Sequence, residues 1–278
     1  MSKNRLNGSG ILWMLGIIIM IIIVIVPVFF MFKYSISDRA SVVTGGKPIP
    51  LWPYEPTIEQ FAGLMTMERF FSSFIVSLEV SLLSVVISLL VGTPAAYALA
   101  RSRFPGVMVL AMLLVSVRLF PDIVSVVPVV EIFIKAGLIN SIFGTAMAHS
   151  LLSIPYVIFI AMGIFETIPR DLEEQAWILG ANRLGAFIRI VLPVALPGLA
   201  AAAIYVFLLS WDEFIFAYFL LTFGDLSTLP VLLQKILSWA PQHNLIAAIS
   251  VMLSVPVIIF TFIVQKYMRA GATAGAVK

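Results

Sequence analysis

Charged side chains are scarce in this sequence. Only 11% of its 278 residues are Asp, Glu, Lys or Arg, whereas 61% are hydrophobic. A soluble domain carries about 25% charged residues, so this chain has too little charge to cover a water-soluble globule. The composition therefore indicates an integral membrane protein.

Cysteine is missing and histidine is rare. The chain has no Cys and only two His residues, His149 and His243. The lack of Cys excludes disulfides, thiol catalysis and Cys-ligated metals, and no histidine cluster or His-Glu-x-x-His pattern indicates another metal site. A phosphate-binding G-x4-G-K-[ST] loop and a G-x-S-x-G serine motif are also missing. We therefore expect no catalytic residue and no cofactor in this chain.

Clusters of basic residues are lacking too. The formal net charge is +3, and the 17 Lys and Arg residues are scattered singly or in pairs. Nucleic acid is therefore not an expected partner. The scattered pattern is typical of the signals that set the topology of a membrane protein.

What the chain does have is a series of long apolar segments. A spanning helix needs about 20 apolar residues, and alternating ten-residue strands, as in a membrane barrel, are not seen. We predict an all-α polytopic protein with six transmembrane helices at 11–33, 73–100, 107–130, 142–165, 190–217 and 245–265. Arg118, Pro121 and Asp122 interrupt the third segment. Its apolar part should end near Phe120, with 121–140 as a short amphipathic segment at the outer surface.

The distribution of charge among the loops predicts the topology. The first apolar segment follows Lys3 and Arg5 but lacks a small-residue cleavage site, so we predict a retained span. With the N-terminus inside, the inner loops hold ten basic and four acidic residues, against seven and seven outside. This bias favours cytoplasmic N- and C-termini. Residues 1–70 would form the N-terminal segment, first span and outer loop, and 71–278 the transmembrane core.

The polar loop at 169–193 separates two apolar spans. Pro169 and Asp171 are expected to start a short helix, with Glu174 three residues later as in a capping box. Gly180 should end that helix or allow the close approach of another backbone. Pro193 and Pro197 should kink the start of the fifth span, where neighbouring helices must absorb the kink.

This short helix carries much apolar surface. Leu172, Trp177, Ile178 and Leu179 all belong to it. A helix of this length is not stable alone in water, and its apolar side chains should be covered. The cover is either the membrane and the protein's own helices, or another protein.

The spacing in this loop resembles a known motif. Glu174-Gln175-Ala176, three residues, Gly180, nine residues and then Ile190–Pro193 resembles the E-A-A loop of ATP-binding-cassette importer permeases. Gln175 replaces the first Ala of that pattern, and Leu179 stands where the family often has Asp. The resemblance implies the type I importer permease fold and a coupling helix that docks on a separate ATPase. The residues implied in this coupling are Glu173, Glu174, Ala176, Leu179, Gly180, Ala181 and Arg183.

The end of the chain gives a second resemblance. By composition, the end at 271–278 is a small, flexible tail, for which an ordinary frayed terminus is one interpretation. It also resembles the tail of the maltose-type second permease (MalG-like) of carbohydrate importers, as do Ser102–Gly106 and Ser210–Phe214 elsewhere. This implies that the tail at 266–278 contacts the ATPase subunits through Gly271, Thr273, Gly275, Val277 and Lys278.

The resemblance also implies partners and a location. These are a MalF-like sister permease, two ATPase subunits that carry ATP and Mg, and an extracytoplasmic substrate-binding protein. All would assemble at the lipid bilayer of the bacterial cytoplasmic (inner) membrane. A loop at Phe223, Gly224 and Asp225 would contact the binding protein, although Gly-Asp is also ordinary turn chemistry.

Three carboxylates lie in or beside apolar spans. Glu79, Asp212 and Glu213 are there either because they pair within the protein or because they line the translocation pathway. Tyr205 and Trp211 are aromatic residues that either pack in the core or face a sugar. Because Arg118 is the single Arg near the pathway, we favour a neutral oligosaccharide or glycoside over an acidic solute. Glycerol-phosphate-like and polyol substrates remain alternatives, as do a self-sufficient secondary carrier and an intramembrane enzyme.

Overall fold

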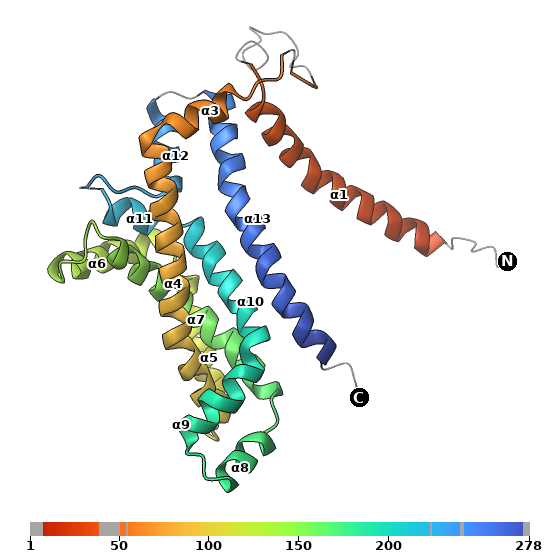
Figure 1. Cartoon of the computed structure of the whole chain (residues 1–278), viewed down its shortest axis with the longest axis vertical. Helices are drawn as coiled ribbons and strands as arrows, with labels where there is room; N and C mark the ends of the chain where they lie inside the picture. Colours follow the sequence, from red (N-terminus) through yellow and green to blue (C-terminus); the bar gives the residue numbers. More distant parts are fainter. Residues whose placement is uncertain (1–7, 39–50, 54, 223, 240–241, 275–278) are drawn as a thin grey trace. The chain divides into compact units, whose positions relative to one another are not determined.

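In the part of the chain that the structure describes, all regular secondary structure is helical. The structure is a computed structural model that describes residues 8–38, 51–53, 55–222, 224–239 and 242–274. A single antiparallel bridge joins Ser37 and Pro56 there. The elements are α1 Gly8–Ser35, α3 Glu59–Thr66, α4 Glu68–Arg101, α5 Val107–Ser116, η1 Val117–Leu119, α6 Asp122–Lys135, α7 Ile142–Thr167, α8 Asp171–Ile178, α9 Arg183–Ala186, η2 Phe187–Val191, α10 Leu192–Trp211, α11 Ile215–Leu220, α12 Leu229–Trp239 and α13 His243–Ala274 (Figure 1).

Five of the described helices are long and apolar enough to cross a membrane. They are Trp13–Ser35, Glu68–Arg101, Ile142–Thr167, Arg183–Trp211 and His243–Ile263. The third predicted span is a bent pair, Val107–Leu119 followed by Asp122–Lys135, with 95° between the two helices. The bend falls at Phe120 and Pro121, which are both extended. The all-α prediction and the break near Phe120 are therefore confirmed.

The chain divides into two compact units. One comprises Met1–Glu68 and Leu233–Val255, and the other comprises Arg69–Leu232 and Pro256–Lys278. In the first unit, α1 is exposed around its whole circumference between Trp13 and Phe29. A helix that is apolar on every side requires lipid or another protein around it.

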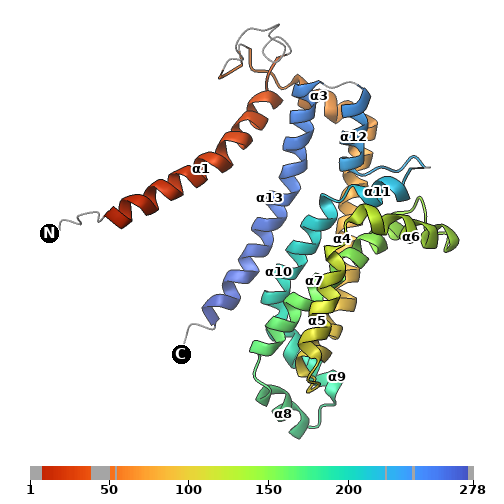
Figure 2. The ribbon, with the colours of Figure 1, turned by 180° about the vertical axis from the view of Figure 1, so that it is seen from behind.

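The second unit is built around α4, α7 and α10. Figures 1 and 2 show these helices side by side with α5, and one buried cluster draws residues from all four. Small residues line their contacts, which lets the helices approach closely, as is common between membrane spans. At Gly92 on α4, an added Cβ would lie 2.6 Å from Val157 Cγ1 on α7.

The fifth span begins with a π-helical turn. Phe187–Val191 forms this turn and runs directly into α10. Pro193 then lies in the first turn of α10, where the N–H group that proline lacks is not needed. The disturbance expected from Pro193 is therefore absorbed by the π turn within the chain itself.

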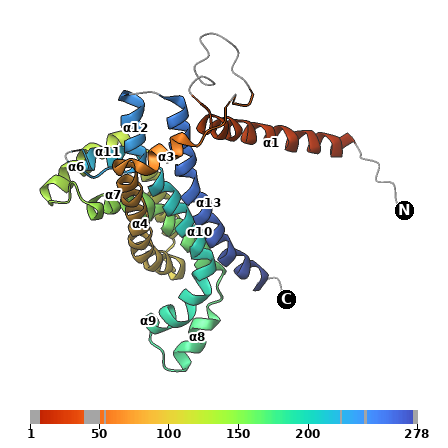
Figure 3. The same cartoon turned by 45° about the horizontal axis from the view of Figure 1, so that its top comes forward.

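The loops of the second unit lie at two ends. α8 and α9 form one end, and α6 and α11 lie toward the other (Figures 1 and 2). Figure 3 shows α8 and α9 projecting beyond the start of α10. The polar loop at 169–193 and the loop after α11 thus lie on opposite sides of this unit.

The close contact at Gly92 predicts a difference between two glycine substitutions. We expect Gly92→Ala to destabilise the protein, because overpacking against the stiff Val157 side chain costs about 1–3 kcal/mol. Gly163→Ala on α7 has no heavy atom within 4 Å of its added Cβ and should gain about 1 kcal/mol of helix propensity. Thermal unfolding of the two variants in detergent measures this. Equal midpoints would show that α4 and α7 are not in close contact at Gly92.

Candidate functional site: the α8 loop and a polar cavity

A buried ion pair fixes α8 to the end of α4. The Glu173 side chain is only 3% exposed, and its Oε1 accepts a hydrogen bond of 2.6 Å from Arg101 Nε. The Tyr97 hydroxyl donates to the other carboxylate oxygen of Glu173. The Tyr97 ring packs on Phe187, with 4.5 Å between ring centroids. Two side chains of α4 thus hold one carboxylate of α8.

The same guanidinium also binds the end of α7. Arg101 Nη1 donates to the Phe165 carbonyl at 2.9 Å, and Nη2 donates to the Ile168 carbonyl at 3.0 Å. Carbonyls at a helix C-terminus have no partner within their helix, so a cation there is stabilising. Arg101 therefore joins α4, α7 and α8 through a single side chain.

The start of α8 differs from the predicted capping box. The N-cap is Arg170 and makes no side-chain capping bond, and Asp171 is the first helical residue. The Arg170 carbonyl accepts the N–H groups of Glu173 and Glu174, because Arg170 already has helical dihedral angles. The capping-box prediction was therefore wrong, and the helix begins one residue earlier than that prediction placed it. Asp171 still lies in the first turn, where a negative charge favours the helix dipole.

The end of α8 has the predicted glycine. Gly180 has φ +87°, a left-handed conformation that glycine adopts without strain. Its N–H donates to the Trp177 carbonyl at 3.0 Å, and the Ala181 N–H donates to the Ala176 carbonyl at 2.9 Å. These two bonds make a Schellman motif. No heavy atom lies within 4 Å of an added Cβ, so Gly180 ends the helix and is not a point of close contact within the chain.

The remaining side chains of α8 separate into two faces. Ala176 is buried with Glu173, whereas Glu174 and Trp177 are exposed. Ile178 is 84% exposed and Leu179 is 88% exposed. Of the other residues implied in coupling, Ala181 is half-buried, and Arg183 is exposed, with its guanidinium 6.0 Å from the Trp177 ring. The exposed face is thus apolar, beside the charges of Glu174 and Arg183.

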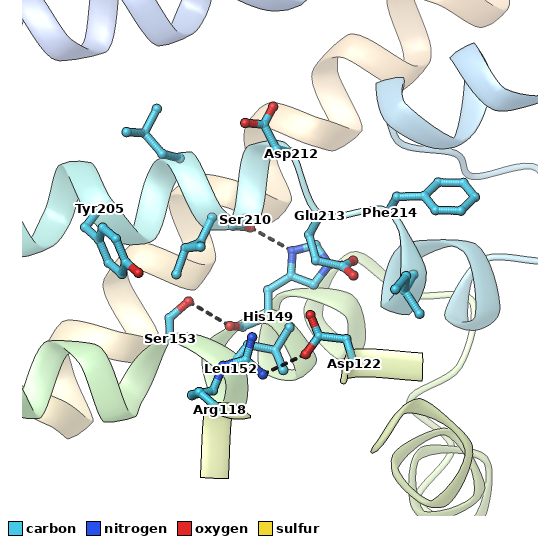
Figure 4. Close-up of a pocket in the computed structure, with 13 residues that line it drawn as sticks. Arg118, Asp122, His149, Leu152, Ser153, Tyr205, Ser210, Asp212, Glu213 and Phe214 are labelled. Carbon is cyan, nitrogen blue, oxygen red and sulfur yellow. Dashed lines mark hydrogen bonds and ion pairs between the residues drawn. The ribbon is translucent and has the colours of Figure 1, made fainter. Parts of the chain in front are cut away.

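A polar cavity lies between α7, α10 and the start of α11. Its volume is about 580 Å³, and Figure 4 shows Asp212 on the opposite side from Arg118 and Asp122. Of the suggested pathway residues, Tyr205, Asp212 and Glu213 line it. Trp211 does not: it is 1% exposed and lies in contact with Phe74 and Phe207. Trp211 is therefore a packing residue.

Most charges around the cavity are satisfied internally. Arg118 Nη1 donates to Asp122 Oδ1 at 2.8 Å. Glu213 Oε2 lies 2.9 Å from His149 Nε2, and the carboxylate accepts the N–H groups of Phe216 at 2.8 Å and Ala217 at 3.0 Å. These donors stabilise the ionised form of Glu213 and cap α11. The Asp212 carboxylate is exposed to the cavity and has no hydrogen-bond or ion-pair partner among the described residues.

The His149 ring links this cavity to the core. Its Nδ1 lies 2.8 Å from Ser210 Oγ, and that hydroxyl donates to Ser84 Oγ at 3.2 Å. The network therefore runs through α7, α10 and α4. His149 is a satisfied structural residue as well as part of the cavity wall.

The other suggested positions lie elsewhere. Glu79 is exposed on α4 and does not line the cavity. Gly224 and Asp225 are exposed in the loop after α11, beside Asn140, and Phe223 lies outside the described residues. α13 continues to Ala274, so Gly271 and Thr273 are helical where a flexible tail was expected. Gly275, Val277 and Lys278 lie outside the described residues.

Comparisons with known proteins assign the family. Residues 81–272 match the family of binding-protein-dependent transport system inner membrane components. The chain is 32% identical to the trehalose transport system permease SugB of Mycobacterium tuberculosis, over 91% of this chain and 92% of SugB. It is 30% identical to the trehalose/maltose permease MalG of Thermococcus litoralis, over 96% of each chain.

A solved structure gives the same result. A chain of a bacterial ATP-binding-cassette transporter that imports the acidic polysaccharide alginate superposes with a TM-score of 0.80 at 25% identity. The match covers 96% of this chain and 99% of that one. The helical bundle and its α8 loop thus define an importer permease of type I fold, a transport subunit and not an enzyme. The chain belongs to the family of binding-protein-dependent transport system inner membrane components, which are multi-pass proteins of the inner membrane.

Nothing in the sequence indicated that Tyr97 and Arg101 hold Glu173, because they lie 76 and 72 residues before it. Within the described ranges, no group of three or more His, Asp or Glu residues is placed to hold a metal ion.

The Schellman motif predicts the effect of two substitutions at Gly180. Gly180→Val should cost about 1–2 kcal/mol, because an L-residue with a branched Cβ is strained in the left-handed region. Gly180→Asn should be tolerated better, since Asn enters this region more readily. Hydrogen exchange of the amides at 180 and 181 measures the effect. Equal protection in both variants would show that the end of α8 does not depend on the left-handed turn.

Proposed function

We propose that the chain is a permease subunit of a carbohydrate importer and that α8 is its coupling helix. The observation that supports this most directly is the apolar face of α8. Ile178 and Leu179 are exposed at the end of the unit while Glu173 on the opposite face is fixed to α4 and α7. A rigidly held helix with an uncovered apolar face is suited to bind another protein.

The partner at α8 is an ATPase subunit that carries ATP and Mg, since this family of importers is powered by a separate chain. A complete importer would contain two such subunits and a sister permease. The end of α13, with its small Gly271 and Thr273, would contact the same ATPases. The exposed loop at Gly224 and Asp225 lies toward the other end of the unit, where an extracytoplasmic binding protein would dock.

The positions of the Arg residues indicate which end of the unit faces the cytoplasm. Arg101, Arg103, Arg170, Arg183 and Arg189 belong to the end of the unit that carries α8. Because inner loops of membrane proteins carry an excess of Lys and Arg, this end is cytoplasmic. With six spans, both termini would lie in the cytoplasm as well.

The cavity supports a neutral, hydroxyl-rich substrate. Asp122 pairs with Arg118, so this cation is not free to bind an anion, and the carboxylate exposed at the cavity is that of Asp212. A free carboxylate accepts hydrogen bonds from sugar hydroxyls and repels an anion. The relatives named for trehalose and maltose transport agree with such a solute. The anion-repelling charge makes a glycerol-phosphate-like substrate less suitable.

Transport would proceed by alternating access. ATP binding closes the ATPases, α8 carries the motion to the spans, and the bundle changes between inward-open and outward-open states. A loaded binding protein favours the outward-open state because it binds that state better. Glu79 would then face protein or water, because a carboxylate exposed to lipid is costly.

Coupling at α8 can be tested with Leu179→Asp. We expect the complex to lose ATPase association and ligand-stimulated ATP hydrolysis, because a charge would enter an apolar contact. Phe104→Asp is a matched control: Phe104 is 63% exposed and lies in the α4–α5 connection at the same end. The measurements are co-purification of the ATPase and hydrolysis in proteoliposomes. Wild-type behaviour of Leu179→Asp, or an equal loss in the control, would contradict the assignment of α8.

The substrate site can be tested with Asp212→Asn. A hydrogen bond to a charged group contributes about 1.5–3 kcal/mol, so uptake of a neutral disaccharide should weaken about tenfold or more. Uptake of an acidic oligosaccharide should not weaken, because the repelling charge is gone. Glu131→Gln, on an exposed ion pair of α6, is the control. If neutral uptake is unchanged while the complex remains active, the cavity is not part of the pathway.

A further inference from the structure

We propose that Arg101 is a positioning residue that transmits the movement of α8 to α4 and α7. This rests on the proposed function of α8 as the coupling helix. The Arg101 guanidinium contacts the Glu173 carboxylate and the carbonyls of Phe165 and Ile168 at distances between 2.6 and 3.0 Å. Each of its three nitrogens is therefore engaged, and each bond leads to α8 or to the end of α7.

The arrangement is specific for arginine. The three nitrogens lie in one plane at fixed angles, so the bonds fix the direction of α8 as well as its distance from α4. A lysine ammonium is a point charge on a flexible chain and cannot hold all three acceptors in this geometry. Arg170 adds a weaker bond, from Nη2 to the Ala100 carbonyl at 3.4 Å.

The remaining attachments of α8 are the bond from the Tyr97 hydroxyl to Glu173, its two connections along the chain and its buried apolar side. Ile168–Arg170 precedes the helix, and the turn at Gly180 follows it. Ala176 is buried and Leu172 packs against the buried cluster, but neither apolar side chain forms a directional bond that resists rotation of the helix. Without Arg101, the Tyr97 bond and these connections alone would hold α8, and a force on its exposed face would turn the helix more easily. With the Arg101–Glu173 bond, the same force displaces the ends of α4 and α7.

Burial of the pair supports a positioning role beyond stability. The side chain of Arg101 is 14% exposed and that of Glu173 is 3% exposed, so both charges are largely removed from water. A buried ion pair often stabilises no better than an apolar pair of similar volume, whereas removal of one partner alone is strongly destabilising. Stability and coupling should therefore respond differently when both partners are replaced together.

The experiment compares single and double variants in the full complex. Arg101→Met, Arg101→Lys and the double variant Arg101→Met with Glu173→Met are reconstituted with the ATPase and the binding protein. Arg103→Met is the control, because Arg103 is exposed two residues further along the chain, in the connection after α4. The measurements are ATPase association, thermal midpoint, ATP hydrolysis with and without loaded binding protein, and the solute moved per ATP.

We expect the double variant to recover the thermal midpoint that Arg101→Met loses, and both to bind the ATPase. The solute moved per ATP should fall about tenfold in both, as for the loss of a hydrogen bond to a charged group, and less in Arg101→Lys. Arg103→Met should keep the wild-type ratio. If Arg101→Met does not accumulate, the double variant decides the result.

Two results would overturn the proposal. In one, the double variant regains the wild-type ratio together with its stability, so Arg101 only stabilises the fold. In the other, Arg101→Met is stable and keeps the wild-type ratio. Failure of the proposed function is distinguishable, because the wild-type complex itself would then show no ATPase association through α8 and no stimulated hydrolysis.

Discussion

Lipid offers no hydrogen bonds, so every polar group within the spans must find its partner in the protein. Ser84 and Ser150 of the second unit meet this constraint, whereas the buried hydroxyls of Ser81 and Ser88 have no hydrogen-bond partner among the described residues. Ser84 Oγ donates to the Ala146 carbonyl at 3.1 Å as well as to Val80 in its own helix, and Ser150 Oγ donates to the Ala146 carbonyl at 2.7 Å. The hydroxyls of Ser84 and Ser150 donate to backbone carbonyls, and the small volume of these side chains lets α4 and α7 pack closely.

The same constraint explains how the chain can leave a helix at membrane depth. α10 ends at Trp211 and α11 begins at Ile215, and Glu213 between them accepts two N–H groups of α11. His149 contacts Glu213 through Nε2 and Ser210 through Nδ1, which ties Glu213 to the core. Because Glu213 is satisfied in this way, the break remains ordered and a cavity can form beside it. Asp212, one residue earlier, has its carboxylate exposed to that cavity.

Much of the fold could be predicted because hydropathy and proline are local signals. The spans, the break at Phe120 and the left-handed end of α8 at Gly180 all follow from neighbouring residues. The start of α8 was misplaced by one residue, since Asp171 could serve equally as a cap or as the first helical residue. The extension of α13 to Ala274 was also missed, because the low helix propensity of Gly271 favours an end to the helix there.

The site depended on contacts that a single sequence does not show. Arg101 and Glu173 are 72 residues apart, and nothing near either residue indicates the other. Tyr205 and Trp211 belong to one helix, but six residues at about 3.6 per turn place them on different faces. The hydrophobic pattern of α10 is too uniform to tell which face meets the cavity and which meets Phe74. The assignment of these two aromatic residues therefore required the structure.

The two polar centres of the second unit share the same two helices. α4 carries Arg101 at one end and Ser84 in its middle, and α7 carries Phe165 at one end and His149 in its middle. At about 1.5 Å per residue, each pair is about 25 Å apart along its helix. A continuous helix resists compression, so a displacement of the helix end at the Arg101 contact also moves residues several turns away. The hydrogen bonds beside the cavity therefore involve α4 and α7, the two helices that Arg101 joins to α8.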